Sequence, residues 1–279
     1  MPNSTHPWRQ PEIGAETQLI PVLGDPIAQV RAPALMNGLL ARHGVDTVVV
    51  PVHARAENLD SVVRGLQAVG NVRGLLITIP HKIDVLRHAA VHSPAAALAG
   101  SANALRREPD GSWHAENFDG AGFVAGLVAH GFSPAGRQVA VIGAGGAGSA
   151  VAAALLDAEV SQLTVYDRDG DRMTALVDRL GSRWPGRVEP GAAARFGSAD
   201  IVINATPLGL SPTDELPFDP AGLRPGAVVA DIVMKPRRTR LLRLAETLGH
   251  PVHYGEPMLT HQVELYCAYF GLVAEQVRS

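Results

Sequence analysis

The sequence is poor in cysteine and in long apolar runs, and each shortage excludes a class of protein. A single cysteine, Cys267, excludes an intramolecular disulfide and a cysteine-based zinc site, and we interpret it as a small apolar helix residue. The eleven histidines show no H-E-x-x-H or similar ligand spacing, so no metal is expected. No apolar run reaches the roughly 18 residues of a membrane span, so no membrane partner is expected.

An excess of charge of one sign is also lacking. The chain has 24 basic against 27 acidic side chains and a net charge of −3, with no run of Lys or Arg that could follow a phosphate backbone. Nucleic acid is therefore not an expected partner. Residues 1–16 lack the apolar core of a signal peptide, which predicts a cytoplasmic protein. We expect a small-molecule substrate, bound by a monomer or a homodimer.

Short apolar strands alternate with helical stretches, the order that builds parallel sheets covered by helices. The 279 residues, 46% of them apolar, suffice for two modest domains. The fold class is α/β: an N-terminal α/β substrate domain over residues 1–120, with a C-terminal helix at 256–279 packing back on it, and a Rossmann-type dinucleotide-binding domain over 121–255. A cleft between them would hold substrate away from water. Strands are expected at 17–24, 47–53, 72–80, 139–142, 162–167, 199–206 and 227–233, helices at 33–44, 57–70, 149–158, 238–249 and 258–279, and a polar leader up to about residue 17.

The stretch VAVIGAGGAG (139–148) carries the strongest functional signal. An apolar strand leads into Gly143, Gly145 and Gly148 at G-x-G-x-x-G spacing, and a helix follows. The first glycine allows the tight turn, the second lets a pyrophosphate approach the backbone, and the third lets helix and strand pack closely. The free amides and positive dipole end of the helix N-terminus would face that pyrophosphate. A glycine-rich loop without a ligand is the alternative interpretation.

The next strand, QLTVYD, ends in Asp167. A carboxylate there accepts hydrogen bonds from ribose hydroxyls and repels a 2′-phosphate, so it favours NAD as the cofactor. Arg168 follows and could hold the 2′-phosphate of NADP, but Asp169 and Asp171 surround it with negative charge. NADP is therefore the less favoured cofactor.

Short segments outside the glycine turn occur in an order that resembles the shikimate dehydrogenase family from residue 18 to the C-terminus. They are TIPHK (78–82), GSANAL (100–105, family G-A-x-N-T), ENFDG (116–120, family N-x-D-G), NATPLGL (204–210), DIVMKPRRTRLL (231–242) and GEPMLTHQ (255–262). The resemblance implies hydride transfer between a nicotinamide cofactor and the hydroxyl of shikimate, quinate or a related cyclic hydroxy acid, with shikimate the leading substrate.

The resemblance also implies roles for single residues. Lys82 is the catalytic lysine and Asp119 its partner, and they suit the removal and return of a hydroxyl proton. Taken alone they could be a surface lysine and a solvated aspartate. Thr78, Asn103 and Gln262 are expected to contact substrate, although Asn103 could be a turn former and Gln262 an exposed helix residue. His81 is assigned no catalysis, and Asn117 is interpreted as a turn former. The expected cofactor-binding residues are Gly143, Ala144, Gly145, Gly146, Ala147, Gly148, Asp167, Arg168, Asn204, Thr206, Pro207, Leu208, Val233, Gly255 and Met258, of which Met258 also fits a packing role.

The substrate lobe departs from the family pattern. After G-x-P-I the family has S-x-S-x-S-P, and the resemblance implies that the first two serines hold the carboxylate of shikimate. Ala28, Val30 and Ala32 stand at the three serine positions here, and Leu76 replaces an asparagine. An unsatisfied carboxylate in a cleft costs on the order of a few kcal/mol, so Gln29 and Arg31 are the candidate replacements. The losses favour retained chemistry with altered substrate preference. The alternative hypothesis is an NAD(H)-binding relative with little turnover, acting as a sensor or regulator.

Overall fold

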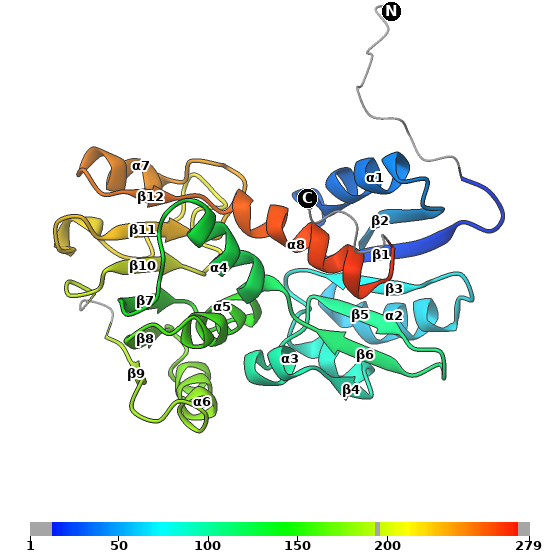
Figure 1. Cartoon of the computed structure of the whole chain (residues 1–279), viewed down its shortest axis with the longest axis horizontal. Helices are drawn as coiled ribbons and strands as arrows, with labels where there is room; N and C mark the ends of the chain where they lie inside the picture. Colours follow the sequence, from blue (N-terminus) through cyan, green and yellow to red (C-terminus); the bar gives the residue numbers. More distant parts are fainter. Residues whose placement is uncertain (1–12, 193–195, 273–279) are drawn as a thin grey trace, which may run out of the picture. The chain divides into compact units, whose positions relative to one another are not determined.

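The computed structural model describes residues 13–192 and 196–272, and this part of the chain is an α/β protein with two six-stranded sheets (Figure 1). The expected leader before residue 13 and the end of the expected C-terminal helix after residue 272 lie outside the described residues. The chain divides into two compact units. The first comprises Met1–His92, Ala102–Glu116 and Val263–Ser279, and the second comprises Ser93–Ser101 and Asn117–Gln262.

The first unit contains a mixed sheet with the strand order β2-β1-β3-β5-β6-β4. Its members are β1 (Gln18–Gly24), β2 (Thr47–His53), β3 (Gly74–Ile77), β4 (Val91–His92), β5 (Ala104–Arg107) and β6 (Trp113–Glu116). Strand β1 runs parallel to β2 and β3, as the alternating sequence pattern predicts. Helices α1 (Ala32–Arg42) and α2 (Leu59–Ala68), with the short η1 (Ala56–Asn58) and η2 (Asp84–His88), complete the expected alternation.

The expectation of parallel strands alone is wrong for this sheet, because β5 runs antiparallel to both β3 and β6. A tight loop joins β5 to β6 and contains Asp110 and Gly111, with Gly111 at a φ of +83°. Two strands joined by so short a connection can only pair antiparallel. The Asp-Gly pair is a hairpin signal that could have predicted this loop.

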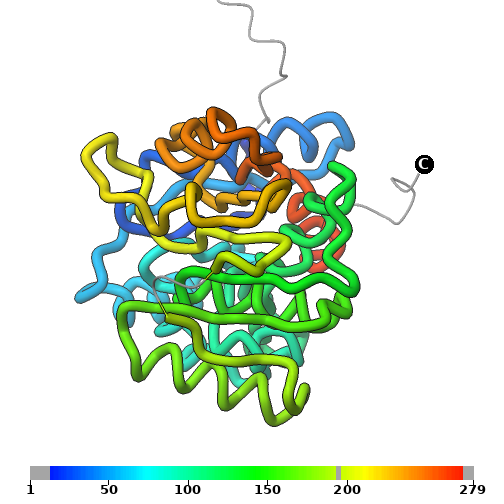
Figure 2. Tube along the Cα trace, turned by 90° about the vertical axis from the view of Figure 1, so that its left-hand side faces the viewer, coloured from blue at the N-terminus to red at the C-terminus, as the bar shows by residue number. Residues whose placement is uncertain are grey.

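The second unit contains a wholly parallel sheet with the order β12-β11-β10-β7-β8-β9. Its strands are β7 (Gln138–Ile142), β8 (Gln162–Tyr166), β9 (Val188–Pro190), β10 (Ile201–Asn204), β11 (Val228–Asp231) and β12 (Val252–His253). Its helices are α3 (Pro94–Ala99), α4 (Asp119–Ala129), α5 (Gly146–Asp157), α6 (Gly170–Gly181) and α7 (Arg240–Thr247), with η3 at Pro220–Gly222. Figure 2 turns this unit toward the viewer, and its trace from green to orange passes back and forth through the strands.

The strand order reverses beside β7. From β7 the chain continues outward to β8 and β9, then returns to the other side of β7 for β10, β11 and β12. Open α/β sheets bind ligands at the carboxyl ends of the strands at such a reversal. The loops after β7, β8 and β10 are therefore the ones where a ligand is expected.

Helix α8 (Glu256–Tyr269) belongs to the second unit up to Gln262 and to the first unit beyond it. Within the first unit, arginines of the sheet hold the C-terminal end of this helix. Arg73 Nε donates to the carbonyl of Phe270 at 2.6 Å, and Arg106 Nη1 donates to the carbonyl of Tyr269 at 2.7 Å. Cys267 is buried in α8, as expected of an apolar helix position, and burial raises the pKa of its thiol to about 11. Among the described residues, no helix is both long and apolar enough to cross a membrane.

Candidate active site

The glycine turn after β7 has the geometry of a dinucleotide site. Gly143 has a φ of +108°, and a Cβ on it would lie 2.8 Å from the carbonyl oxygen of Ala205. A Cβ on Gly148 would overlap the carbonyl oxygen of Gly143. The fold itself therefore requires the first and third glycines.

Gly145 differs, because neither its backbone conformation nor the packing around it requires a glycine. It precedes α5 in an extended conformation, with a φ of −73° that any residue adopts, and a Cβ on it would meet nothing within 4 Å. The missing side chain leaves open space beside the first amides of α5. A pyrophosphate needs that access to the backbone, so these residues fit the cofactor that the sequence predicts.

The carboxylate of Asp167 lies at the glycine turn. Its Oδ2 accepts a hydrogen bond from the amide of Ala144 at 2.7 Å, and its Oδ1 accepts one from the amide of Asp169 at 2.9 Å. Arg168 is exposed beside it. The end of β8 thus presents a carboxylate at the turn and a guanidinium on the surface, the two kinds of group that distinguish NAD from NADP in dinucleotide-binding folds.

A buried polar cluster fixes the loop after β10. Asn204 Nδ2 donates to the carbonyl of Leu208 at 2.9 Å and to Asp231 Oδ1 at 3.0 Å, while Asn204 Oδ1 accepts from the amide and hydroxyl of Thr206. Asp231 also accepts from the hydroxyl of Thr239 at 2.7 Å and from the amide of Val233 at 2.9 Å. Burial raises the pKa of Asp231 to about 6.

The loops after β10 and β11 are therefore joined through side chains. Pro207 is exposed on the first loop, and Val233 is buried on the second. Gly255 packs against the backbone of Ile232 and Val233, with no room for a Cβ. Met258 is buried in the core of the second unit, which agrees with the packing interpretation.

Two predicted site residues, distant in sequence, meet in the second unit. Gln262 Nε2 donates to Asp119 Oδ1 at 3.2 Å, and both side chains are buried. Asp119 is the first residue of α4, and its amide donates to Asn117 Oδ1 at 3.0 Å. The alternatives of a solvated aspartate and an exposed glutamine are therefore wrong for this pair.

In the first unit, β3 ends at Ile77 and the TIPHK segment forms a turn. The amide of Thr78 donates to Leu23 O, and the carbonyl of Lys82 accepts from the amide of Ala102 at 2.7 Å. His81 is buried and its Nε2 lies 2.7 Å from the carbonyl oxygen of Ala54. His81 thus fastens the backbone beside Lys82 through its contact with Ala54.

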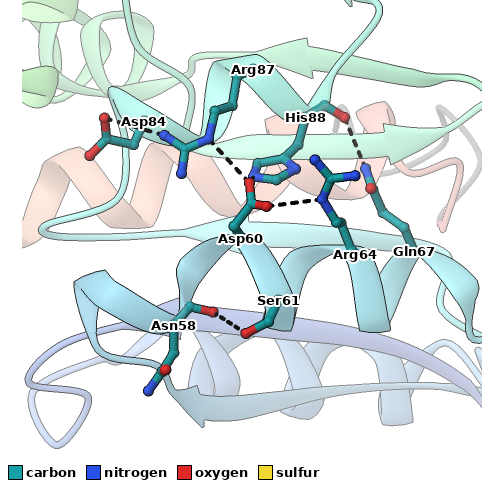
Figure 3. A network of polar contacts seen from close by, with 8 residues as sticks. All are labelled: Asn58, Asp60, Ser61, Arg64, Gln67, Asp84, Arg87 and His88. Carbon is teal, nitrogen blue, oxygen red and sulfur yellow. Dashed lines mark hydrogen bonds and ion pairs between the residues drawn. The ribbon is translucent and has the colours of Figure 1, made fainter.

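A surface network fastens η2, which begins two residues after Lys82 (Figure 3). Asp60 of α2 accepts from Arg64 Nε at 3.0 Å and from Arg87 Nε at 3.3 Å, and its Oδ1 lies 3.1 Å from Nε2 of His88. The hydrogen bonds from the two arginines lower the pKa of the Asp60 carboxyl. One carboxylate therefore ties the first turn after Lys82 to helix α2.

Asn103 and the loop after β1 complete the predicted substrate residues. Asn103 is buried, its carbonyl accepts from the amide of Ile77 at 2.9 Å, and its amide donates to Glu116 O at 3.0 Å. After β1, Ala28 and Arg31 are exposed and Gln29 is half-buried, with Arg31 preceding the first turn of α1. At the start of the same loop, Asp25 Oδ1 lies 2.8 Å from His53 Nε2.

Comparison with known proteins identifies the family. Two family models match, a shikimate dehydrogenase substrate binding domain over residues 22–105 and a shikimate/quinate 5-dehydrogenase domain over residues 127–209. A shikimate dehydrogenase (NADP(+)) of Rubrobacter xylanophilus is 40% identical over 268 residues, which are 94% of each chain. The chain belongs to the shikimate dehydrogenase family. It is an NAD(P)-dependent oxidoreductase of the shikimate/quinate type, as the motifs predict.

Solved structures of the family and its relatives share the fold. The shikimate 5-dehydrogenase of Listeria monocytogenes in complex with shikimate and NAD is 27% identical with a TM-score of 0.81, covering 93% of this chain and 92% of that one. The ligand-free 5-ketofructose reductase of Gluconobacter sp. strain CHM43 is 29% identical with a TM-score of 0.79, covering 92% and 94%. Relatives of this fold are thus named for both a cyclic acid and a neutral ketose.

Sequence reasoning assigned no role to three residues that organise the site. Asp231 and Thr239 lie in a segment that was recognised only as a family motif, although a lone aspartate at the end of an apolar strand is a signal of its own. Ser101 carried no signal, because a serine after a glycine is ordinary in a turn. Only the fold shows what its hydroxyl contacts.

Proposed function

We propose that this protein catalyses reversible hydride transfer between a nicotinamide cofactor and a hydroxyl of shikimate or a related cyclic hydroxy acid, with Lys82 and Asp119 as the acid/base pair. The observation that carries the proposal is the 3.2 Å hydrogen bond from Gln262 to Asp119. The two residues come from different family motifs and are buried together, where an aspartate is costly unless it is hydrogen-bonded.

Each proposed group has a distinct task. A bound nicotinamide would accept or supply the hydride. Lys82 takes the hydroxyl proton during oxidation and returns it during reduction, while the carboxylate of Asp119 holds the lysine ammonium in position. Thr78, Asn103 and Gln262 orient the hydroxyls of the ring, and Gln29 and Arg31 are the groups proposed to meet the carboxylate.

The deciding test is Lys82→Ala. We expect turnover to fall by at least about a hundredfold, because general acid–base catalysis typically contributes 10²–10⁴-fold. The dissociation constant for the cofactor, measured by fluorescence of the reduced nicotinamide, should change less than about twofold. Equal loss of turnover and cofactor binding would contradict the role of Lys82. Absence of turnover by the wild-type protein on every acid tested, with intact cofactor binding, would favour the sensor hypothesis instead.

We also propose NAD as the preferred cofactor. Asp167 supports this, because its carboxylate sits at the glycine turn where a ribose hydroxyl is bound in this class of site. The Rubrobacter relative is named for NADP, so the preference is a property expected of this chain rather than of its relatives. We expect kcat/KM to be at least about tenfold higher with NAD than with NADP, and a higher value with NADP would overturn this proposal.

A second candidate substrate is a neutral polyhydroxy ketone. Ala28, Val30 and Ala32 offer no side-chain hydrogen-bond donor, and a structural relative of this chain is named 5-ketofructose reductase. A site that lacks hydrogen-bond donors for a carboxylate loses less binding free energy when its substrate has no carboxylate. Initial rates with shikimate, quinate and 5-ketofructose, each measured with both cofactors, separate the two candidates. A rate confined to the ketose would replace the first candidate with the second.

A further inference from the structure

The hydroxyl of Ser101 joins two parts of the second unit, the first turn of α5 and the segment that leads to Asp119. Its Oγ donates to the carbonyl of Gly146 at 2.7 Å, and Gly146 is the first residue of α5. The same Oγ accepts from Asn117 Nδ2 at 2.9 Å, and the backbone carbonyl of Ser101 accepts from that nitrogen at 3.1 Å. Ser101 and Asn117 are both buried, so these bonds are not exchanged with water.

From Asn117 the connection continues to the proposed catalytic carboxylate. Asn117 Oδ1 accepts from the amide of Asp119 at 3.0 Å, and Asp119 Oδ1 accepts from Gln262 at 3.2 Å. Each bond in this series ends on a residue that makes the next one, and at Asp119 the series passes from the backbone amide to the side-chain carboxylate. The first turn of the dinucleotide helix is thus linked to Asp119 through two buried side chains.

The backbone that carries Ser101 is itself held in place. Arg179 of α6 donates to the carbonyls of Leu98 and Ala99 at 2.7 and 3.0 Å, at the end of α3, and Gly100 follows with a φ of +62°. Burial lowers the pKa of the Arg179 guanidinium, yet it stays charged at any physiological pH. A charged group therefore fixes the turn from which the Ser101 hydroxyl reaches Gly146.

Close helix packing makes the link stiff. A Cβ on Gly120 would overlap the carbonyl oxygen of Ala150 in α5, and a Cβ on Gly122 would lie 2.5 Å from the carbonyl oxygen of Met258 in α8. Helix α4, which begins at Asp119, thus has backbone contact with α5 on one side and α8 on the other. A small shift of the first turn of α5 must be transmitted to α4, because packed interiors do not absorb it.

We propose that Ser101 is a positioning residue that couples occupation of the dinucleotide turn to the placement of the Asp119 carboxylate. A phosphate group bound at the amides of α5 fixes Gly146, and the Ser101 hydroxyl passes this constraint through Asn117 to the first residue of α4. The inference rests on the proposed function, since Asp119 has its part in catalysis only there.

The test compares Ser101→Ala with a matched control, Ser93→Ala. Both serines are buried and flank helix α3, but Ser93 Oγ accepts from the amide of Ala96 and caps the start of that helix. Ser101→Ala keeps the fold, because Gly146 O remains inside a helix and Asn117 keeps its bond to the backbone carbonyl of Ser101. Ser101→Thr restores the hydroxyl and serves as the rescue variant.

The coupling between the dinucleotide turn and Asp119 can be measured without substrate, by hydrogen exchange and mass spectrometry with and without NAD. In the wild-type protein and in Ser93→Ala we expect NAD to slow exchange both at residues 143–148 and at residues 117–123. In Ser101→Ala it should slow exchange at 143–148 only, and Ser101→Thr should recover the second effect. Protection of 117–123 that is the same in Ser101→Ala and the wild type would overturn the proposal.

Kinetics supply the second measurement. Ser101→Ala should lower kcat by roughly fivefold to tenfold and move the acidic limb of its pH profile, while KM for the cofactor changes less than about twofold. Ser93→Ala should lower the melting temperature and leave kcat and the pH profile unchanged. Equal kinetic effects of the two variants would reduce Ser101 to a structural role. A wild-type protein without turnover would contradict the proposed function, and the exchange data would still decide the coupling.

Discussion

At the scale of single residues, substitutions of Gly145 and Gly148 are expected to have different effects, the first on cofactor binding and the second on stability. A Cβ on Gly145 meets open space, whereas one on Gly148 overlaps the carbonyl oxygen of Gly143. We expect Gly145→Ala to change the free energy of unfolding by less than about 1 kcal/mol, since the backbone conformation suits alanine. It should weaken NAD binding by at least about tenfold, because the methyl group blocks the approach of the pyrophosphate to the backbone.

Gly148→Ala is the matched variant, and it should lower the free energy of unfolding by roughly 1–3 kcal/mol through overpacking. Urea unfolding and NAD titration of both variants check the prediction. A Gly145→Ala protein that binds NAD as tightly as the wild type would contradict the assignment of this turn.

Residue identities in the site could be predicted from sequence, but their contacts could not. The motifs predict Asp119 and Gln262 as functional residues, yet the hydrogen bond between them depends on how α4 packs against α8. The same holds for Ser101, whose hydroxyl meets Gly146 only because α3 and α5 pack together. Long-range pairs of this kind are properties of the packed helices, which a local motif does not contain.

At the scale of elements, the buried cluster around Asp231 joins the loops after β10 and β11 and makes their stability depend on pH. Burial raises the pKa of Asp231 to about 6, from an ordinary value of 3.8. Between these two values the folded state binds more protons than the unfolded state, so the free energy of unfolding contributed by Asp231 falls as pH rises. Asp231→Asn removes this titration and leaves an amide in the same place.

We therefore expect the difference in free energy of unfolding, Asp231→Asn minus wild type, to become more positive by up to about 3 kcal/mol between pH 4 and pH 7. Hydrogen exchange of the core amides of β10, followed at several pH values, measures that difference in the second unit. A difference that stays constant over this range would contradict the raised pKa. Hydrogen bonds that the asparagine amide fails to replace change the free-energy difference by the same amount at every pH, so they do not alter its dependence on pH.

Element prediction succeeded where hydrophobic periodicity is strong. Strands β1, β2, β7, β8, β10 and β11 and helices α1, α2, α5 and α7 lie within the expected ranges to a few residues. The expected continuation of the C-terminal helix beyond Tyr269 is wrong for the described residues, because α8 ends there and a turn follows in which Gly271 has a φ of +61°. The pattern did not predict α3 or α4, because α3 is a short alanine-rich turn of helix and α4 is interrupted by glycines that serve helix contact. Glycine lowers helix propensity, and packing against neighbouring helices outweighs it here.

At the scale of the whole molecule, the order of elements determines the fold class, and the strand reversal beside β7 marks the edge where open α/β sheets bind ligands. The α/β class follows from the alternation of strands and helices alone. The antiparallel strand β5 does not, because its pairing depends on the loop at Asp110 and Gly111 rather than on the apolar pattern. The conformation of the glycine turn is local in sequence and therefore predictable from it, whereas the predicted substrate residues are dispersed among several loops.

The response of the molecule to acid depends on a second buried group. His253 of β12 lies among the rings of Phe123, His130 and Phe132, and neither ring nitrogen has a hydrogen-bond partner among the residues that the structure describes. Burial, with smaller contributions from His130 and His261, lowers the pKa of His253 to about 4. Between pH 4 and 6.5 the unfolded state therefore binds more protons, and the contribution of His253 to stability is lost as pH falls. This slope is opposite in sign to that of Asp231 over the same range.

His253→Leu removes the titrating ring and keeps a similar volume. We expect its free energy of unfolding, relative to wild type, to rise by up to about 3 kcal/mol as pH falls from 7 to 4, measured by the same hydrogen exchange of the second unit. The double variant with Asp231→Asn should then show a flatter profile than either single variant, since both sloping contributions are gone. A His253→Leu profile parallel to that of the wild type would mean that His253 takes up its proton equally in the folded and unfolded states, which would contradict the lowered pKa.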